Sequence, residues 1–157
     1  MIGTAKVYAC GEAEGTALVL TQELSFWGGV EVETGQIIDH SHPDIGKNVA
    51  GKILVMPSGR GSSSSSSVLA EMIRLGTGPI GIIMARADPI LTVASLVAQS
   101  LYGVQCPVVV CAIDGFATGD RVRISPTGGA ATGGRTARIS TVRRKHSTTG
   151  SAGPSPA

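Results

Sequence analysis

The sequence predicts a single α/β domain in which a parallel β-α-β-α-β unit forms the core of β/β/α layers. Three short runs of apolar, mostly β-branched residues read as strands buried on both faces, and they lie at 52–56, 80–84 and 107–111. Two stretches with helical periodicity separate these runs. Such alternation is typical of parallel sheets with right-handed crossovers. A length of 157 residues also favours one domain over two.

Further strands are expected on either side of this unit. Thr4–Ala9 and Thr16–Leu20 are strand-like runs joined by the glycine-bounded segment 11–15, and 36–38 is a shorter candidate that follows several glycine breaks. Arg121–Ser125 comes after a Thr-Gly-Asp turn and is expected to close one edge of the sheet. These additions to the parallel unit favour a compact layered fold over a full doubly wound sheet.

Both predicted helices carry recognisable end signals. Gly76 can take the left-handed conformation that ends the first helix. Asp88 can cap the second helix, Pro89 suits its first position, and Gly103 can end it. The inward face of the first helix is predicted from apolar residues at helical spacing: Val68, Leu69, Met72, Ile73 and Leu75. The same spacing predicts the inward face of the second: Ile90, Val93, Ala94, Val97 and Leu101.

Composition divides the chain into a body, 1–126, and a tail, 127–157. The tail is rich in Gly, Ser, Thr and Pro and has few large aliphatic residues, so it is expected to be disordered. It holds five basic side chains and no acidic one, whereas the body holds eight basic and eleven acidic side chains, a net charge of −3. The basic run Arg143-Arg144-Lys145 is interpreted as a solvated charge run rather than as a nucleic-acid site.

Several function classes are disfavoured. Five aromatic residues in the whole chain are too few for the stacking platforms of a single-strand nucleic-acid binder. The three cysteines, Cys10, Cys106 and Cys111, lack the spacing of a disulfide framework or a zinc site and are interpreted as free thiols, with no metal bound by this chain. No secretion signal or membrane-length apolar run is visible, so a cytoplasmic location without membrane contact is expected.

The chemistry is predicted at the carboxyl ends of the three parallel strands, where the loops of open α/β sheets gather ligands. The most unusual of these loops is Pro57–Ser63, because two glycines alternate with Arg60 and a run of six serines follows. Glycines permit close approach to a ligand, and serines at a helix start can cap the helix and offer hydroxyl and amide donors to an anion. Arg60 can form paired hydrogen bonds with a carboxylate or phosphate. The polar residues expected at the common rim are Arg60, Ser62, Ser63, Arg86, Asp88 and Asp114.

These residues alone form an incomplete active site. A serine hydroxyl lies roughly 8 to 9 pK units above neutrality, on the order of 11 kcal/mol, whereas a helix terminus contributes at most about 2 kcal/mol. A serine base would therefore need help from a neighbouring base, a metal or cations outside this motif. His40 and His42 are the only histidines of the body, and hydrogen-bonding roles are favoured over catalysis for both.

A set of short runs also points to a known family. They occur in order within the body: Leu24-Ser25-Phe26-Trp27-Gly28-Gly29, Thr34-Gly35, Ile38-Asp39-His40, His42-Pro43, Gly51–Ser63 and Ala87-Asp88-Pro89-Ile90. This pattern resembles the swivel domain of the aconitase X family, and the resemblance covers most of residues 1–126. It implies an aconitase-like swivelling fold and a small subunit that docks on a large aconitase X subunit. The resemblance also implies that the large subunit, and not this chain, carries an iron-sulfur cluster.

The resemblance further implies a hydro-lyase, a dehydratase that is active only with its large subunit. Ser62 would be the base that removes the Cα proton of a hydroxy acid, and Arg60, Gly61 and Ser63 would bind the substrate. Phe26-Trp27 and Arg60 favour cis-3-hydroxy-L-proline, dehydrated to a pyrroline-2-carboxylate, over phosphomevalonate. The neighbouring serines remain possible substitutes for Ser62, and Phe26-Trp27 could instead belong to the core or to a subunit interface.

Two other classes stay open. Swivelling domains that carry phosphohistidine share a β/β/α layout and often end in a turn like Gly119-Asp120, but they need a histidine where this chain has serines. A non-catalytic anion-binding module would use the same turn without any chemistry. Acid-labile phosphate on His40 or His42 would favour the first class, and a Ser62 variant altered only in binding would favour the second.

Overall fold

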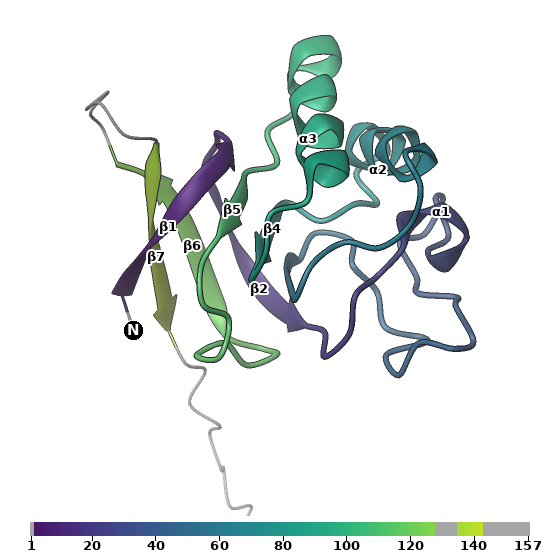
Figure 1. The fold of residues 1–157 in the computed structure, drawn as a ribbon, viewed down its shortest axis with the longest axis horizontal. Coiled ribbons are helices and arrows are strands. Elements are labelled where there is room, and N and C mark those ends of the chain that lie inside the picture. Colours follow the sequence, from purple (N-terminus) through teal and green to yellow (C-terminus); the bar gives the residue numbers. More distant parts are fainter. Residues whose placement is uncertain (1, 128–134, 143–157) are drawn as a thin grey trace, which may run out of the picture.

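In the computed structural model, which describes residues 2–127 and 135–142, the strands form one sheet that closes on itself. Around this barrel the strand order is β1-β5-β4-β3-β2-β6-β7. Figure 1 shows β1, β6 and β7 on the left of the molecule and α1 and α2 on the right. The elements in chain order are β1 (Ile2–Ala9), β2 (Ala13–Val19), α1 (Phe26–Gly29), β3 (Ile53–Met56), α2 (Ser64–Leu75), β4 (Gly81–Met84), α3 (Pro89–Tyr102), β5 (Val108–Val110), β6 (Arg121–Pro126) and β7 (Thr136–Val142).

The parallel unit predicted from the sequence is present. β3, β4 and β5 pair in parallel, with Val55 opposite Ile83 and Ile83 opposite Val109, and α2 and α3 form the crossovers. Alternate side chains of these strands belong to two cores: Leu54 packs in the cluster that includes the helices, and Val55 in the cluster that fills the barrel. Burial on both faces explains why these strands are continuously apolar.

Closure of the sheet corrects two expectations. The strands are not divided into separate layers, because β1, β6 and β7 continue the sheet antiparallel until it meets itself. β6 is therefore not an edge, since it pairs with β2 on one side and β7 on the other. The candidate strand 36–38 forms only isolated bridges, from Gln36 to Asn48 and from Ile37 to Val30.

The expectation of a disordered tail is wrong for residues 136–142. This segment forms β7, which pairs with β1 and β6 and buries Ala137 and Ile139 in the barrel. Two inward residues at a period of two suffice here, because β7 has a hydrogen-bonded neighbour on each side. Residues 128–134 and 143–157 of the predicted tail, which include Arg143-Arg144-Lys145, lie outside the described residues.

The helix ends agree with the sequence signals, but one helix face does not. Gly76 and Gly103 end α2 and α3 in the left-handed conformation, with φ of 81° and 68°, and Asp88 Oδ1 accepts a hydrogen bond from the amide of Ile90. On α3 the predicted inward residues Val93, Val97 and Leu101 are exposed. The buried face consists mainly of small residues, which allow the helix to approach the sheet closely: Leu91, Ala94, Ser95 and Ala98.

Candidate functional site

The turn from β3 into α2 is held against the segment that precedes α1. Gly59 forms a parallel bridge with Leu24, and the amide of Arg60 donates to the Leu24 carbonyl at 3.1 Å. Gly61 has a φ of +112°, and a Cβ there would lie 2.6 Å from Ser25 Oγ. The two glycines of the predicted motif thus bring the turn into close contact with its neighbours in the chain. Their expected close approach to a ligand stays a prediction.

The three loops expected to gather ligands are Pro57–Ser63, Ala85–Asp88 and Ala112–Gly115, and the first two meet at this turn. The amide of Arg86 donates to the Pro57 carbonyl at 3.1 Å, and Asp88 packs so closely on Gly59 that a Cβ there would lie 2.1 Å from Asp88 Oδ2. The third loop lines a different cavity, to which Ala112 and Gly115 contribute. Asp88 therefore joins the β4–α3 loop to the turn that carries Ser62.

Ser62 is exposed and immediately precedes the N-cap residue of α2, Ser63. Its carbonyl accepts from the amide of Ser65 at 3.0 Å. Ser63 has helical φ and ψ, and its side chain makes no capping hydrogen bond, which differs from the capping role expected for these serines. Because the first turn of α2 holds no acidic side chain, the partial positive charge of the helix N-terminus faces the position of Ser62 unopposed by its own helix.

Arg60 is exposed and lines an open depression of about 400 Å³ together with Thr21, Gln22, Glu23 and Pro57. Glu23 forms an ion pair with Arg86 at 2.5 Å. The pKa of Asp39 is lowered, first by the hydrogen bonds that it accepts from the hydroxyl and amide of Ser41, and further by the charges of His42 and Arg60. The Arg60 guanidinium therefore interacts electrostatically with the Asp39 carboxylate beside the serine turn.

The two histidines occupy different environments. His42 is buried, and its Nδ1 accepts from the amide of Asp44 at 3.0 Å, so a neutral ring carries its proton on Nε2, which faces the Gln22 carbonyl at 3.4 Å. Both ring nitrogens are thus engaged in holding the loop. His40 is exposed. The hydrogen-bonding role favoured from the sequence fits the geometry of His42.

Comparison with known proteins decides the family. A family model described as "Aconitase X swivel domain" matches residues 2–132. The chain belongs to the aconitase X swivel domain family. The swivel domain superposes on the crystal structure of Thermococcus kodakaraensis aconitase X in its holo form with a TM-score of 0.73 and 29% identity, covering 90% of this chain and 99% of that chain.

Relatives of this swivel domain carry two different activity names. Cis-3-hydroxy-L-proline dehydratase of Hypocrea jecorina is 46% identical over 114 residues, which are 73% of this chain and 19% of that protein. Phosphomevalonate dehydratase small subunit of Methanopyrus kandleri is 45% identical over 86 residues, which are 55% of this chain and 64% of that protein. This chain thus spans about a fifth of the first relative and most of the second.

The described part of the swivel domain does not fit an iron-sulfur cluster or another metal. No group of three or more His, Cys, Asp or Glu side chains converges among the described residues. Cys106 is fully buried, its Sγ lies 3.4 Å from the Pro79 carbonyl, and burial raises the pKa of its thiol to about 12. The three cysteines are free, as expected.

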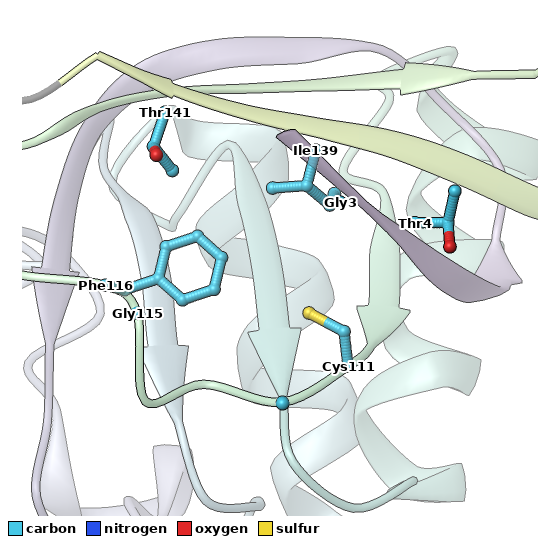
Figure 2. A pocket seen from close by; sticks show the side chains of 8 residues that line it. Gly3, Thr4, Cys111, Gly115, Phe116, Ile139 and Thr141 are labelled. Atoms are coloured by element: carbon cyan, nitrogen blue, oxygen red, sulfur yellow. The ribbon is translucent and has the colours of Figure 1, made fainter. Parts of the chain in front are cut away.

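A second cavity, of about 250 Å³, lies beside β1 and β7 and is mostly apolar (Figure 2). Cys111 and Phe116 line it with Ile139. Burial raises the pKa of the Cys111 thiol, which keeps it in the protonated, weakly nucleophilic form near neutral pH. The residues that line this cavity include no charged side chain comparable to Arg60 of the serine turn.

None of the described helices is long and apolar enough to cross a membrane.

Sequence reasoning missed two serines of the site. Ser25 Oγ lies against Gly61 and donates to the Trp27 carbonyl at 3.0 Å. Ser65 Oγ is buried and has no hydrogen-bond partner among the described residues, and it would lie 3.2 Å from a Cβ at Gly61. Gly61 was the available signal, because a glycine in such a turn indicates that another group packs closely against it. The sequence does not identify that group as Ser25 or Ser65.

Proposed function

We propose that this chain is the small subunit of an aconitase X hydro-lyase that dehydrates cis-3-hydroxy-L-proline, with Ser62 as its base. The observation that carries the proposal is the exposed Ser62 on a two-glycine turn, at the N-terminus of α2 and next to Arg60, in a chain of the aconitase X swivel family. The relatives named as dehydratases and as a small subunit support the reaction class and the assembly.

The reaction removes water from neighbouring carbons of the substrate. Ser62 Oγ would take the Cα proton, and the electron pair of that C–H bond would form the carbon–carbon double bond. The neighbouring hydroxyl would leave as hydroxide and become water by taking up a proton, equivalent to the one that Ser62 has accepted, which returns the serine to its starting state. Arg60 would hold the substrate carboxylate through paired hydrogen bonds. Gly61 and Ser63 would line the bound substrate, because the turn permits close approach and presents amide donors.

Ser62 would act only in a complex. The N-terminus of α2 contributes about 2 kcal/mol at most to the ionised serine, far below the roughly 11 kcal/mol required. A large aconitase X subunit, in a heterodimer or a higher assembly, is proposed to supply the remaining stabilisation and to carry the iron-sulfur cluster, since the described residues offer no ligand set for one.

Phosphomevalonate is the alternative substrate, because relatives of comparable identity carry that name. Arg60 suits either a carboxylate or a phosphate. Of the aromatic pair that favoured hydroxyproline, Phe26 is fully buried and belongs to the core, which leaves Trp27, 62% exposed, as the aromatic side chain available to a ligand or a partner. Trp27 follows Ser25 on the segment that contacts the serine turn.

The proposal is tested by reconstituting the chain with the large aconitase X subunit from the same genome and assaying both hydroxy acids. Wild type should dehydrate cis-3-hydroxy-L-proline, whereas S62A should lose at least 1,000-fold in kcat and still assemble. S67A is the matched control, because Ser67 is an exposed serine one turn into the same helix. R60A should mainly raise KM through loss of the paired hydrogen bonds.

Other results would redirect the assignment. Full activity of S62A together with loss in S63A or S64A would move the base to a neighbouring serine. Turnover of phosphomevalonate alone would select the alternative substrate. If neither acid reacted and S62A changed only anion binding, the chain would be a non-catalytic binding module, and acid-labile phosphate on His40 would indicate a phosphohistidine carrier.

A further inference from the structure

The outer face of α3 exposes large aliphatic side chains in a regular stripe. Val93 and Leu101 are 48% and 67% exposed, and Leu96 and Val97 between them are also exposed. These positions follow the i, i+3, i+4 spacing of one helix face, and Val104, just beyond Gly103, continues it. The stripe is thus a continuous surface of α3 rather than a set of isolated apolar residues.

The outer face of α3 lacks the charged side chains that are typical of a solvent-exposed helix surface. None of the 14 residues of α3 is charged. The neighbouring helix α2 packs against α3 (Figure 1). Unlike α3, it carries an ion pair, Glu71–Arg74, on its surface. The residues of α3 that are buried, Leu91, Ala94, Ser95 and Ala98, lie on its inner side, whereas the large aliphatic residues of its outer side are exposed in the described structure. The outer face is therefore suited to contact with another protein.

The stripe is continuous with the candidate active site. Asp88 caps α3 and packs on Gly59 of the serine turn, so the helix starts at the site, and Val93 lies little more than one turn further on. A specific interface covers about 800 Å² of each partner, more than one helix face provides. A protein seated on α3 must therefore extend over adjacent surface, and the rim that carries Ser62 is directly next to the start of the helix.

We propose that the α3 stripe, formed by Val93, Leu96, Val97 and Leu101, is the surface through which this chain docks on the large aconitase X subunit. The inference rests on the proposed function. A large subunit fits better than a second copy of this chain, because a serine base at the turn needs a neighbouring base, a metal or cations from outside this motif. A partner protein that supplies such groups to the serine turn would also lie next to the start of α3. In the Hypocrea relative the region that matches this domain is 19% of the protein, so a much longer chain accompanies it there.

The test measures binding of the chain to the purified large subunit from the same genome by isothermal titration calorimetry. V97E and L101E place a charge on the stripe and should weaken binding at least 10-fold. V142E is the matched control, because Val142 is an exposed valine on β7, away from α3, and it should bind within twofold of wild type. Because all three positions are exposed, thermal unfolding of the isolated variants should match wild type, which verifies that each is folded.

Three results would overturn the proposal: V97E and L101E binding like wild type, no complex with the large subunit, or a dimer of the isolated chain that V97E dissociates while the large subunit still binds. The last result would assign the stripe to a second copy. A complex that depends on Val97 and Leu101 but dehydrates neither hydroxy acid would support the docking surface and refute the proposed activity, so the two failures are distinguishable.

Discussion

Gly59 is the residue on which the two halves of the candidate site meet. It bridges Leu24 on one side and lies under the Asp88 carboxylate on the other, and a Cβ would also come within 2.8 Å of Leu91 Cδ1. Its φ is not in the left-handed region, so its role is close approach rather than unusual backbone conformation. The absence of a side chain at this position lets the β4–α3 loop rest directly on the serine turn.

Replacing Gly59 by alanine should therefore displace Asp88 and the turn together. We expect G59A to lose about 1 to 3 kcal/mol of unfolding free energy, the usual range for overpacking, and to lower the activity of the reconstituted complex. Urea unfolding measures the first effect. G3A is the control, because a Cβ at Gly3 meets no atom within 4 Å and its φ is ordinary, so its stability should stay near that of wild type. Equal stability of G59A and wild type would show that Asp88 moves aside without cost.

At the level of single residues, sequence reasoning located the turn but not its surroundings. Gly59, Arg60 and Ser62 follow from the local pattern of glycines and serines after a buried strand. The approach of Ser25 to Gly61 depends on how the segment before α1 returns to the sheet, which is a tertiary contact without local signature. The role of Ser62 itself stays a prediction until the reconstituted variants are assayed.

At the level of elements, helix ends were predictable and one helix face was not. Gly76 and Gly103 act through local backbone geometry, which the sequence carries directly. The orientation of α3 depends on competition between two apolar faces, one of large side chains and one of Leu91, Ala94 and Ala98 with Ser95. Periodicity favours the larger side chains, whereas packing selected the smaller ones, because they let α3 approach the sheet and let Ser95 donate to the Cys106 carbonyl.

The cap of α3 provides a prediction at this scale. Asp88 Oδ1 accepts from the Ile90 amide at 2.9 Å, so D88A should destabilise the protein by about 1 kcal/mol, whereas D88N should retain most of the stability because asparagine caps equally well. Thermal unfolding of both variants measures the difference. Equal losses of stability in D88A and D88N would mean that the negative charge of Asp88, which packs on Gly59, stabilises this junction rather than the helix cap.

For the whole molecule, closure of the barrel is the property that local sequence could not reveal. β7 pairs with β1, so residues near opposite ends of the chain become neighbours, with Thr136 opposite Lys6 and Ser140 opposite Ile2. A composition poor in large aliphatic residues suggested a tail, but a strand between two neighbours needs few of them. Closure also removes the exposed edges that β1 and β6 would otherwise present.

If β7 is part of the folding unit, its inward residues must contribute to global stability. Ile139 is 4% exposed and Val142 is 68% exposed on the same strand. I139A should therefore lose about 2 to 5 kcal/mol of unfolding free energy through the cavity it leaves in the barrel, and V142A should change it by about 0.5 kcal/mol or less. Urea unfolding followed by circular dichroism compares the two variants. Equal stability of I139A and V142A would place β7 outside the cooperative fold and return the boundary of the domain to residue 126.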